Sequence, residues 1–165
     1  MDLAEAAASA DALAGEGAER ELAELRARWS DEVEAAARAP DFRVRAGAYR
    51  AVGQFRFRQK LELLRRGLED ESPACRGSAL VSLELLSRDG PAPVNAVRPL
   101  LHELATNDDN GAVRRLAVVC LRNGSPERQT VVLLAGLADD DRQDAEFRSA
   151  AARVAAQLTK KGRAR

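Results

Sequence analysis

The stretch "DFRVRAGA" (residues 41–48) decides the fold, because a phrase of the same form recurs three more times along the chain. Each copy reads apolar-Arg-x-x-Ala, and successive arginines are 31, 38 and 34 residues apart. A period in the thirties is typical of stacked helical repeats, in which each unit buries its apolar face against its neighbours. The four arginines are Arg45, Arg76, Arg114 and Arg148.

The residues around each arginine predict that the phrase opens a helix. Four positions before it stands a residue whose side chain can cap a helix by accepting a hydrogen bond from an unpaired N–H. Positions −1, +3 and +7 from the arginine are apolar and fall on one side of a helix. The four predicted caps are Asp41, Ser72, Asn110 and Asp144.

Leucine-rich segments alternate with the phrases and predict the partner helix of each hairpin. They end in acidic or amide turns, such as "EDES" (69–72) and "TNDDN" (106–110). We therefore predict an all-α repeat domain over 17–158, with a flexible acidic segment over 1–16 and a flexible basic tail over 159–165. The four predicted hairpins cover about 18–53, 57–88, 93–122 and 126–158.

The composition narrows the class of protein. The 26 basic and 26 acidic side chains cancel, which argues against a protein that coats nucleic acid non-specifically. Aromatic residues make up 4 % of the chain, so the core must be aliphatic and rich in alanine.

Cys75 and Cys120 lack the neighbouring ligands of a zinc site and are predicted to be buried thiols, as in a reducing cytoplasm. No apolar run reaches the length of a membrane span, so we expect a cytoplasmic protein.

The phrase and its turns resemble HEAT and HEAT-like repeats. That family places an aspartate in the turn within each repeat, about six residues before the arginine of the second helix. Asp70 precedes Arg76 by six residues, and Asp108 precedes Arg114 by six. The units are short, like the compact HEAT-like repeats of bacterial proteins, and the richness in alanine and arginine also suggests a bacterial source.

The resemblance implies a right-handed α-solenoid of about four hairpins, with the phrase helices on its concave side. It also implies that turn aspartates pair with arginines of adjacent repeats, so we interpret the phrase arginines as joints rather than ligand contacts. Two copies depart from the pattern, since Ala39 stands in the aspartate position of the first and Asp141 comes one residue early in the fourth. The ladder residues are Arg45, Asp70, Arg76, Asp108, Arg114, Asp141 and Arg148.

Positions +1, +5 and +8 from each arginine are predicted to point away from the hairpin core. Position +5 holds Val81 and Val119 in adjacent repeats, which a solvated helix face does not usually carry. Two interpretations stay open: a groove for a partner helix or extended peptide with acidic flanks, or burial of both valines by a neighbouring helix. The candidate partner-binding residues are Arg50, Val81, Glu84, Arg115, Val119, Arg122 and Arg153.

Residues 42–66 suggest nucleic-acid binding as an alternative. They hold eight basic side chains against one acid, together with three of the four phenylalanines, and this mixture can grip phosphates and stack on bases. Against it, residues 2–34 carry ten acids that are able to neutralise this segment within the fold. The candidate contacts are Arg43, Arg50, Arg56, Arg58 and Lys60.

Catalytic motifs are missing from the sequence. His102 is the only histidine and has no serine or cysteine partner at a recognisable spacing. The acidic run "ADDDRQDAE" (138–146) lacks the spaced ligands and the central glycine of a calcium loop. We predict a non-catalytic protein-interaction or scaffold module without a metal or cofactor. Because some HEAT-like proteins assist the attachment of bilin pigments, a chaperone-like or lyase-like helper of an enzyme stays a further alternative.

Overall fold

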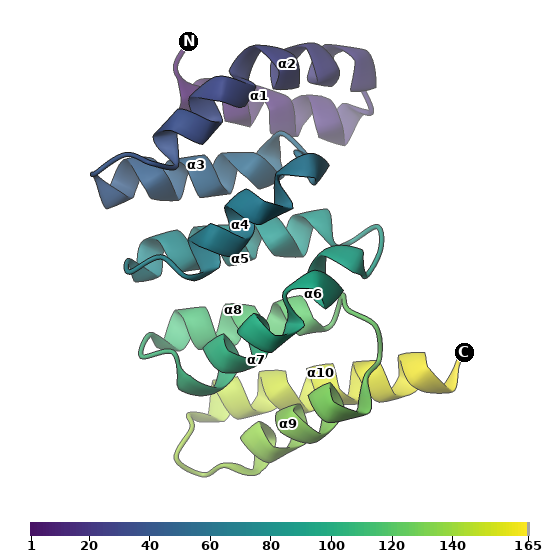
Figure 1. Ribbon diagram of the computed structural model, residues 1–165. Helices are drawn as coiled ribbons and strands as arrows, with labels where there is room; N and C mark the ends of the chain where they lie inside the picture. The colour runs from purple at the N-terminus through teal and green to yellow at the C-terminus, as the bar shows by residue number, and fades with distance from the viewer. Residues whose placement is uncertain (165) are drawn as a thin grey trace. The chain divides into compact units, whose positions relative to one another are not determined.

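Every regular element in the computed structural model, which describes residues 1–164, is a helix (Figure 1). The all-α, solenoid-type fold class predicted from the repeated phrase is therefore confirmed. The chain divides into two compact units, Met1–Leu86 and Ser87–Arg165. Within residues 1–164, no helix is both long enough and apolar enough to cross a bilayer.

The first unit consists of two hairpins preceded by a further helix. Helices α2 and α3 form one hairpin and α4 and α5 the next, in agreement with the hairpins predicted over 18–53 and 57–88. A single 3-10 turn, η1, leads into α4 (Figure 1). The elements are α1 (Leu3–Glu16), α2 (Glu19–Ala36), α3 (Phe42–Gln54), η1 (Arg58–Lys60), α4 (Leu61–Leu68) and α5 (Pro73–Leu86).

The most extensive helix–helix contact of the first unit joins α3 to α5. At its centre the buried Ser82 hydroxyl donates to the Tyr49 carbonyl (2.5 Å) and accepts from the Gly53 N–H (3.0 Å). A Cβ added at Gly53 would lie 2.8 Å from the Ser82 Cα, so only glycine permits this approach. At Gly53, which holds position +8 of the first phrase, this face of α3 is covered by α5 of the next hairpin.

The N-terminal residues differ from the flexible segment predicted over 1–16, because residues 3–16 form the helix α1. Asp2 and Glu5 make a reciprocal capping box, and Gly17 ends the helix in the left-handed conformation (φ 72°). Helix α1 packs against α2 and α3 and buries Ala6, Ala7 and Ala10. Alanines contribute little apolar area each, so their stripe is weak in the sequence although it packs closely.

The second unit contains the two remaining hairpins, predicted over 93–122 and 126–158. The first helix of the third hairpin splits into α6 and α7 at Val97 (φ −123°, ψ 16°), and Pro99 at the start of α7 has no N–H to donate to the preceding turn. Helix α10 runs five residues into the predicted flexible tail, and Arg165 lies outside the described residues. The helices are α6 (Ala92–Ala96), α7 (Arg98–Asn107), α8 (Gly111–Leu121), α9 (Arg128–Asp139) and α10 (Ala145–Arg163).

Three of the predicted helix caps are confirmed. The side chains of Asp41, Asn110 and Asp144 accept from backbone N–H groups in the first turns of α3, α8 and α10. Cys75 and Cys120 are buried thiols, as predicted. The core is mainly aliphatic, and its largest buried side chains include Phe55, Phe57, Phe147, Leu22, Leu64, Leu80, Leu101 and Leu134.

Candidate functional site

The four phrase arginines share one structural role. Each folds its guanidinium back onto backbone carbonyls in the turn that precedes its own helix. Carbonyls at a helix end have no partner within the helix, so these bonds satisfy otherwise unpaired acceptors and close each hairpin. The accepting carbonyls, at 2.7–3.1 Å, belong to Ala39 and Pro40 for Arg45, Asp70 and Glu71 for Arg76, Asp108 for Arg114, and Ala138 for Arg148.

Arg45 also pairs with the turn aspartate of the next hairpin. Its Nε and Nη2 donate to the two carboxylate oxygens of Asp70 at 2.9 and 3.1 Å, and only 14 % and 9 % of the two side chains are exposed. Burial raises the pKa of Asp70, but hydrogen bonds from Arg45 and from the Ser72 N–H outweigh it and hold the pKa below its usual value. This two-bond pair ties α3 to the turn before α5.

The corresponding pair between Arg114 and Asp141 does not form. Arg114 lies over the Phe147 ring at 5.9 Å, and its buried Nε has no hydrogen-bond partner among residues 1–164. Asp141 is exposed, and the neighbouring carboxylate of Asp140 accepts from Arg142 at 2.9 and 3.1 Å. Asp141, which stands one residue earlier than the repeat pattern places its aspartate, therefore does not pair with Arg114. The pairing of Arg76 with Asp108 stays a prediction.

Three of the predicted groove residues lie in the first unit, Arg50 on α3 and Val81 and Glu84 on α5, and all three are half-buried. The hydroxyl of Ser82 donates to the Arg50 carbonyl (3.1 Å), so Arg50 and Val81 lie beside the same helix crossing. The Arg50 guanidinium has no hydrogen-bond or ion-pair partner among residues 1–164, and its Nη1 is buried. A buried donor without a hydrogen-bond partner, such as this Nη1, is rare in a folded chain.

The other four predicted groove residues lie in the second unit. Arg115 on α8 donates to Glu146 on α10 at 2.8 Å, so it joins these two helices. Val119 is half-buried on α8, while Arg122 at the end of α8 and Arg153 on α10 are exposed. Each unit therefore carries a half-buried valine and at least one arginine on its phrase helices.

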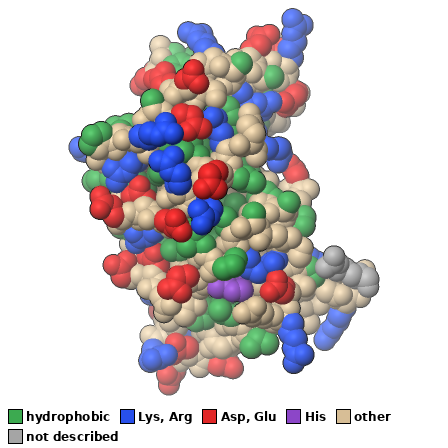
Figure 2. Space-filling model, in the orientation of Figure 1, with side chains coloured by type: hydrophobic (Ala, Val, Ile, Leu, Met, Phe, Trp, Pro, Cys, Tyr) green, Lys and Arg blue, Asp and Glu red, His purple; other side chains and the backbone are tan. Residues whose placement is uncertain are grey.

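Nucleic-acid binding by residues 42–66 stays a prediction, although most of their aromatic rings lie inside the fold and only Phe42 is exposed. Phe55, Phe57 and Tyr49 are buried, so they cannot stack on bases. Four of the five candidate cations are engaged within the unit, the exception being Arg50, and basic and acidic side chains lie next to one another over the face in Figure 2. Arg43 pairs with Asp41, Arg56 with Asp11 and Lys60 with Glu34, and Arg58 donates to the Leu86 carbonyl.

Arg56 directs its charge toward the other helices of the first unit instead of toward solvent. It ends α3 in the left-handed conformation (φ 59°) that usually favours glycine at a helix C-terminus. Its Nη1 donates to the carbonyls of Gly53 and Gln54 and to the Asp11 carboxylate, which is 2.9 Å away. The acids of the N-terminal helices thus neutralise the basic segment.

Comparison with models of known protein families matches residues 30–103 to HEAT repeats. These residues belong to the HEAT repeat family. The matched HEAT repeats include α3, α4 and α5, and with them the pair between Arg45 and Asp70. The arginine phrases of α8 and α10 extend the pattern beyond the match. The curated proteins include none that matches this chain.

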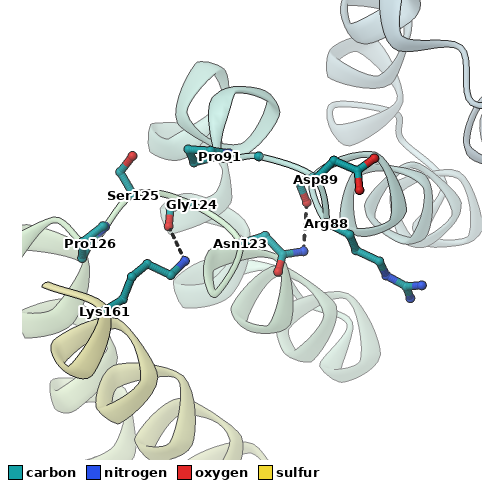
Figure 3. Close-up of a pocket in the computed structure, with 10 residues that line it drawn as sticks. Arg88, Asp89, Pro91, Asn123, Gly124, Ser125, Pro126 and Lys161 are labelled. Atoms are coloured by element: carbon teal, nitrogen blue, oxygen red, sulfur yellow. Dashed lines mark hydrogen bonds between the residues drawn. The ribbon is translucent and has the colours of Figure 1, made fainter. Parts of the chain in front are cut away.

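Two turns between HEAT-like hairpins and the helix α10 enclose a pocket of about 400 Å³ in the second unit (Figure 3). Lys161 Nζ donates to the carbonyls of Arg122 (2.8 Å) and Gly124 (3.0 Å), and burial lowers the pKa of Lys161. The amide of Asn123 donates to the Ser87 hydroxyl at 3.0 Å. These bonds hold the two turns against α10, so the polar groups of the pocket serve the fold.

His102 is half-buried on α7, where its Nε2 lies 2.9 Å from the Thr130 hydroxyl of α9. This contact links two hairpins, and nothing in the sequence around His102 indicates it. Burial lowers the pKa of His102, the nearby Arg98 lowers it further, and Glu127 opposes both. Within residues 1–164, no group of three or more His, Cys, Asp or Glu side chains is placed to hold a metal ion.

We expect the stability of the second unit to fall as the pH drops below about 6.5, the usual pKa of histidine in an unfolded chain. The folded pKa is lowered, so the unfolded state binds the proton more readily, and the contribution of neutral His102 is present above this pH and lost below it. The measurement is the midpoint of urea unfolding between pH 8 and pH 5. His102→Gln keeps a polar contact for Thr130 and should reduce the pH dependence; an equal fall in both proteins would contradict this assignment.

Proposed function

We propose that this protein is a non-catalytic interaction module that holds a partner helix or an extended peptide against its phrase helices. HEAT repeats generally mediate protein–protein interaction or scaffolding, and the match to residues 30–103 supports this class of function. The observation that carries the proposal is the half-buried guanidinium of Arg50, which lacks an acceptor within residues 1–164. An acidic side chain of the partner would supply that acceptor.

The apolar part of the proposed contact comes from two half-buried valines. Val81 lies beside the crossing where Ser82 fastens α3 to α5, so its position is rigid and needs little ordering when a partner binds. Val119 occupies the corresponding place on α8. We propose that each valine anchors a partner segment on its own unit, and that acidic groups of the partner meet Arg50 in the first unit and Arg115, Arg122 and Arg153 in the second. Glu84 would favour a basic group at one point of the partner.

The proposal is tested by affinity capture of the full chain from the cells that produce it, after nuclease treatment and with washes at low and at high salt. We expect a defined protein to be retained at high salt, because apolar anchoring resists salt whereas phosphate contacts weaken steeply. The double variant Arg50→Glu with Arg153→Glu should reduce retention at least about tenfold, which corresponds to roughly 1.4 kcal/mol of binding free energy. Retention that is unchanged in this variant, with its helicity intact, would contradict the proposed site.

Two further variants serve as controls. Arg65→Glu reverses a half-exposed arginine on α4, outside the phrase helices, and should leave retention unchanged. Arg56→Glu with Arg58→Glu reverses the basic turn, and a loss confined to this variant would indicate nucleic acid or a different protein surface. Recovery of nucleic acid from samples without nuclease, at low salt alone, would argue against a protein partner.

A further inference from the structure

Four large apolar side chains are exposed among residues 1–164, and one of them, Val44, lines a pocket of the first unit. Val44 is 46 % exposed, and the exposed Met1 (73 %) and Phe42 (47 %) adjoin the lining residues Asp2 and Arg43 in the sequence. The pocket, of about 380 Å³, lies between the N-terminal ends of α1 and α3 and the C-terminal half of α2. Exposed apolar side chains that gather in this way mark an interaction surface. The apolar walls of the pocket come from Leu3, Ala4, Ala36 and Val44.

The charges at this pocket are acidic. Asp2 and Glu32 line it, and both are exposed. The only cation in the lining is Arg43, whose charge is already matched by two bonds to the Asp41 carboxylate at 3.1 and 3.2 Å. An occupant that fits must therefore bring an apolar side chain next to a basic one.

Val132, the fourth exposed apolar side chain, has a basic residue beside it, as such an occupant requires. Val132 on α9 is 61 % exposed, and Arg128 lies four residues earlier, on the same exposed face of the helix. Ala135 and Gly136 continue this face and are also exposed, so no bulky neighbour screens Val132 along the helix. The complementary charges are local, because Arg128 stands one turn before Val132 on α9, whereas Asp2 and Glu32 line the pocket.

We propose that this chain binds a second copy of itself, with Val132 of one copy inserted into the pocket beside Val44 of the other. Arg128 then faces Glu32 and Asp2, and the pocket covers the apolar side chain that the helix leaves exposed. The contact joins different surfaces of the two copies, so an open complex keeps one unused pocket and one unused α9 face, and copies can add until the assembly closes on itself. Assembly therefore grows with concentration. The surfaces involved include neither Arg50 nor Arg153, so this proposal and the interaction module can fail independently.

Sedimentation velocity of the full chain at low salt, over a wide range of concentration, tests the proposal. We expect the weight-average mass to rise above the 17.8 kDa of one chain as the concentration increases, and to fall again at high salt. Val132→Glu blocks the α9 face, and Val44→Glu places a carboxylate in the pocket beside Glu32. Each variant alone should weaken association at least about tenfold, because a charge would have to be buried unpaired.

A mixture of the two variants separates this mode of assembly from a symmetric one. The intact pocket of Val132→Glu accepts the intact α9 of Val44→Glu, so the mixture should form a one-to-one dimer and nothing larger. A mixture that stays monomeric, or a wild-type chain that stays monomeric at every concentration, would overturn the proposal. Both sites are exposed, so the helicity of each variant should match that of the wild type, and Ala135→Glu with Gly47→Glu provides a second pair of blocking changes.

Discussion

Gly53→Ala is expected to lower the free energy of unfolding by about 1–3 kcal/mol, the usual effect of overpacking a closely fitted contact. Alanine is the better helix former by about 1 kcal/mol, so the sign of the effect is opposite to that of helix propensity. The added Cβ would lie 2.7 Å from the Ser82 hydroxyl oxygen and 2.8 Å from the Ser82 Cα. Backbone cannot move aside as a flexible side chain can, so α3 must shift away from α5 and weaken the hydrogen bonds of Ser82.

Gly47→Ala is the matched control for this prediction. Gly47 lies in the same helix, and an added Cβ would meet nothing within 4 Å. This substitution should raise stability by about 0.4–1 kcal/mol through helix propensity and a less flexible unfolded chain. Urea unfolding of both variants provides the measurement. Equal effects of the same sign would show that the contact between Gly53 and Ser82 does not limit the approach of α3 to α5.

Asp70→Asn is expected to lower the Tm of the first unit by several degrees at neutral pH. The substitution removes the charge that faces Arg45 in a pair of which little is exposed, and it replaces an oxygen acceptor by an amide donor. Asp141→Asn is the control, since Asp141 occupies the turn of the last hairpin but is exposed and lies apart from the phrase arginine. Its Tm should match that of the wild type.

The acid dependence of stability provides an independent check on Asp70. Its folded pKa is lowered below the value of about 3.9 for an unfolded aspartate, so the carboxylate stabilises the fold above this pH. The contribution is lost as the pH falls through the folded pKa. Thermal unfolding between pH 5 and pH 2 should therefore show a smaller loss of Tm in Asp70→Asn than in the wild type. Parallel curves would mean that the pair with Arg45 contributes nothing to stability.

The hairpins could be predicted from the sequence because their signals are local. A cap such as Asp41 and the apolar positions around Arg45 lie within a few residues of one another, and helical geometry alone places them on one side. The pair between Arg45 and Asp70 could be anticipated for a different reason, since the resemblance to HEAT repeats implies that turn aspartates pair with arginines of adjacent repeats. Where the period slips by one residue, as at Asp141, the pair is missing.

The remaining features depend on contacts between helices distant in the sequence. The burial of Gly53 by Ser82 requires the crossing of α3 and α5, which no local pattern specifies. The same holds for Phe55 and Phe57, whose basic neighbours suggest an exposed segment although both rings are buried. The pocket beside Val44 needs α1, which the sequence predicts as flexible because its buried residues are alanines.

The central claim is that the repeated arginines build the repeats, whereas arginines elsewhere on the phrase helices bind the partner. Retention of the captured partner at high salt, measured for Arg45→Gln and Arg50→Glu and normalised to the folded fraction at the same temperature, tests this division most directly. We predict that Arg45→Gln lowers the Tm but retains the partner, and that Arg50→Glu loses the partner with little change in Tm. Loss of the partner in folded Arg45→Gln, together with retention in Arg50→Glu, would contradict the account.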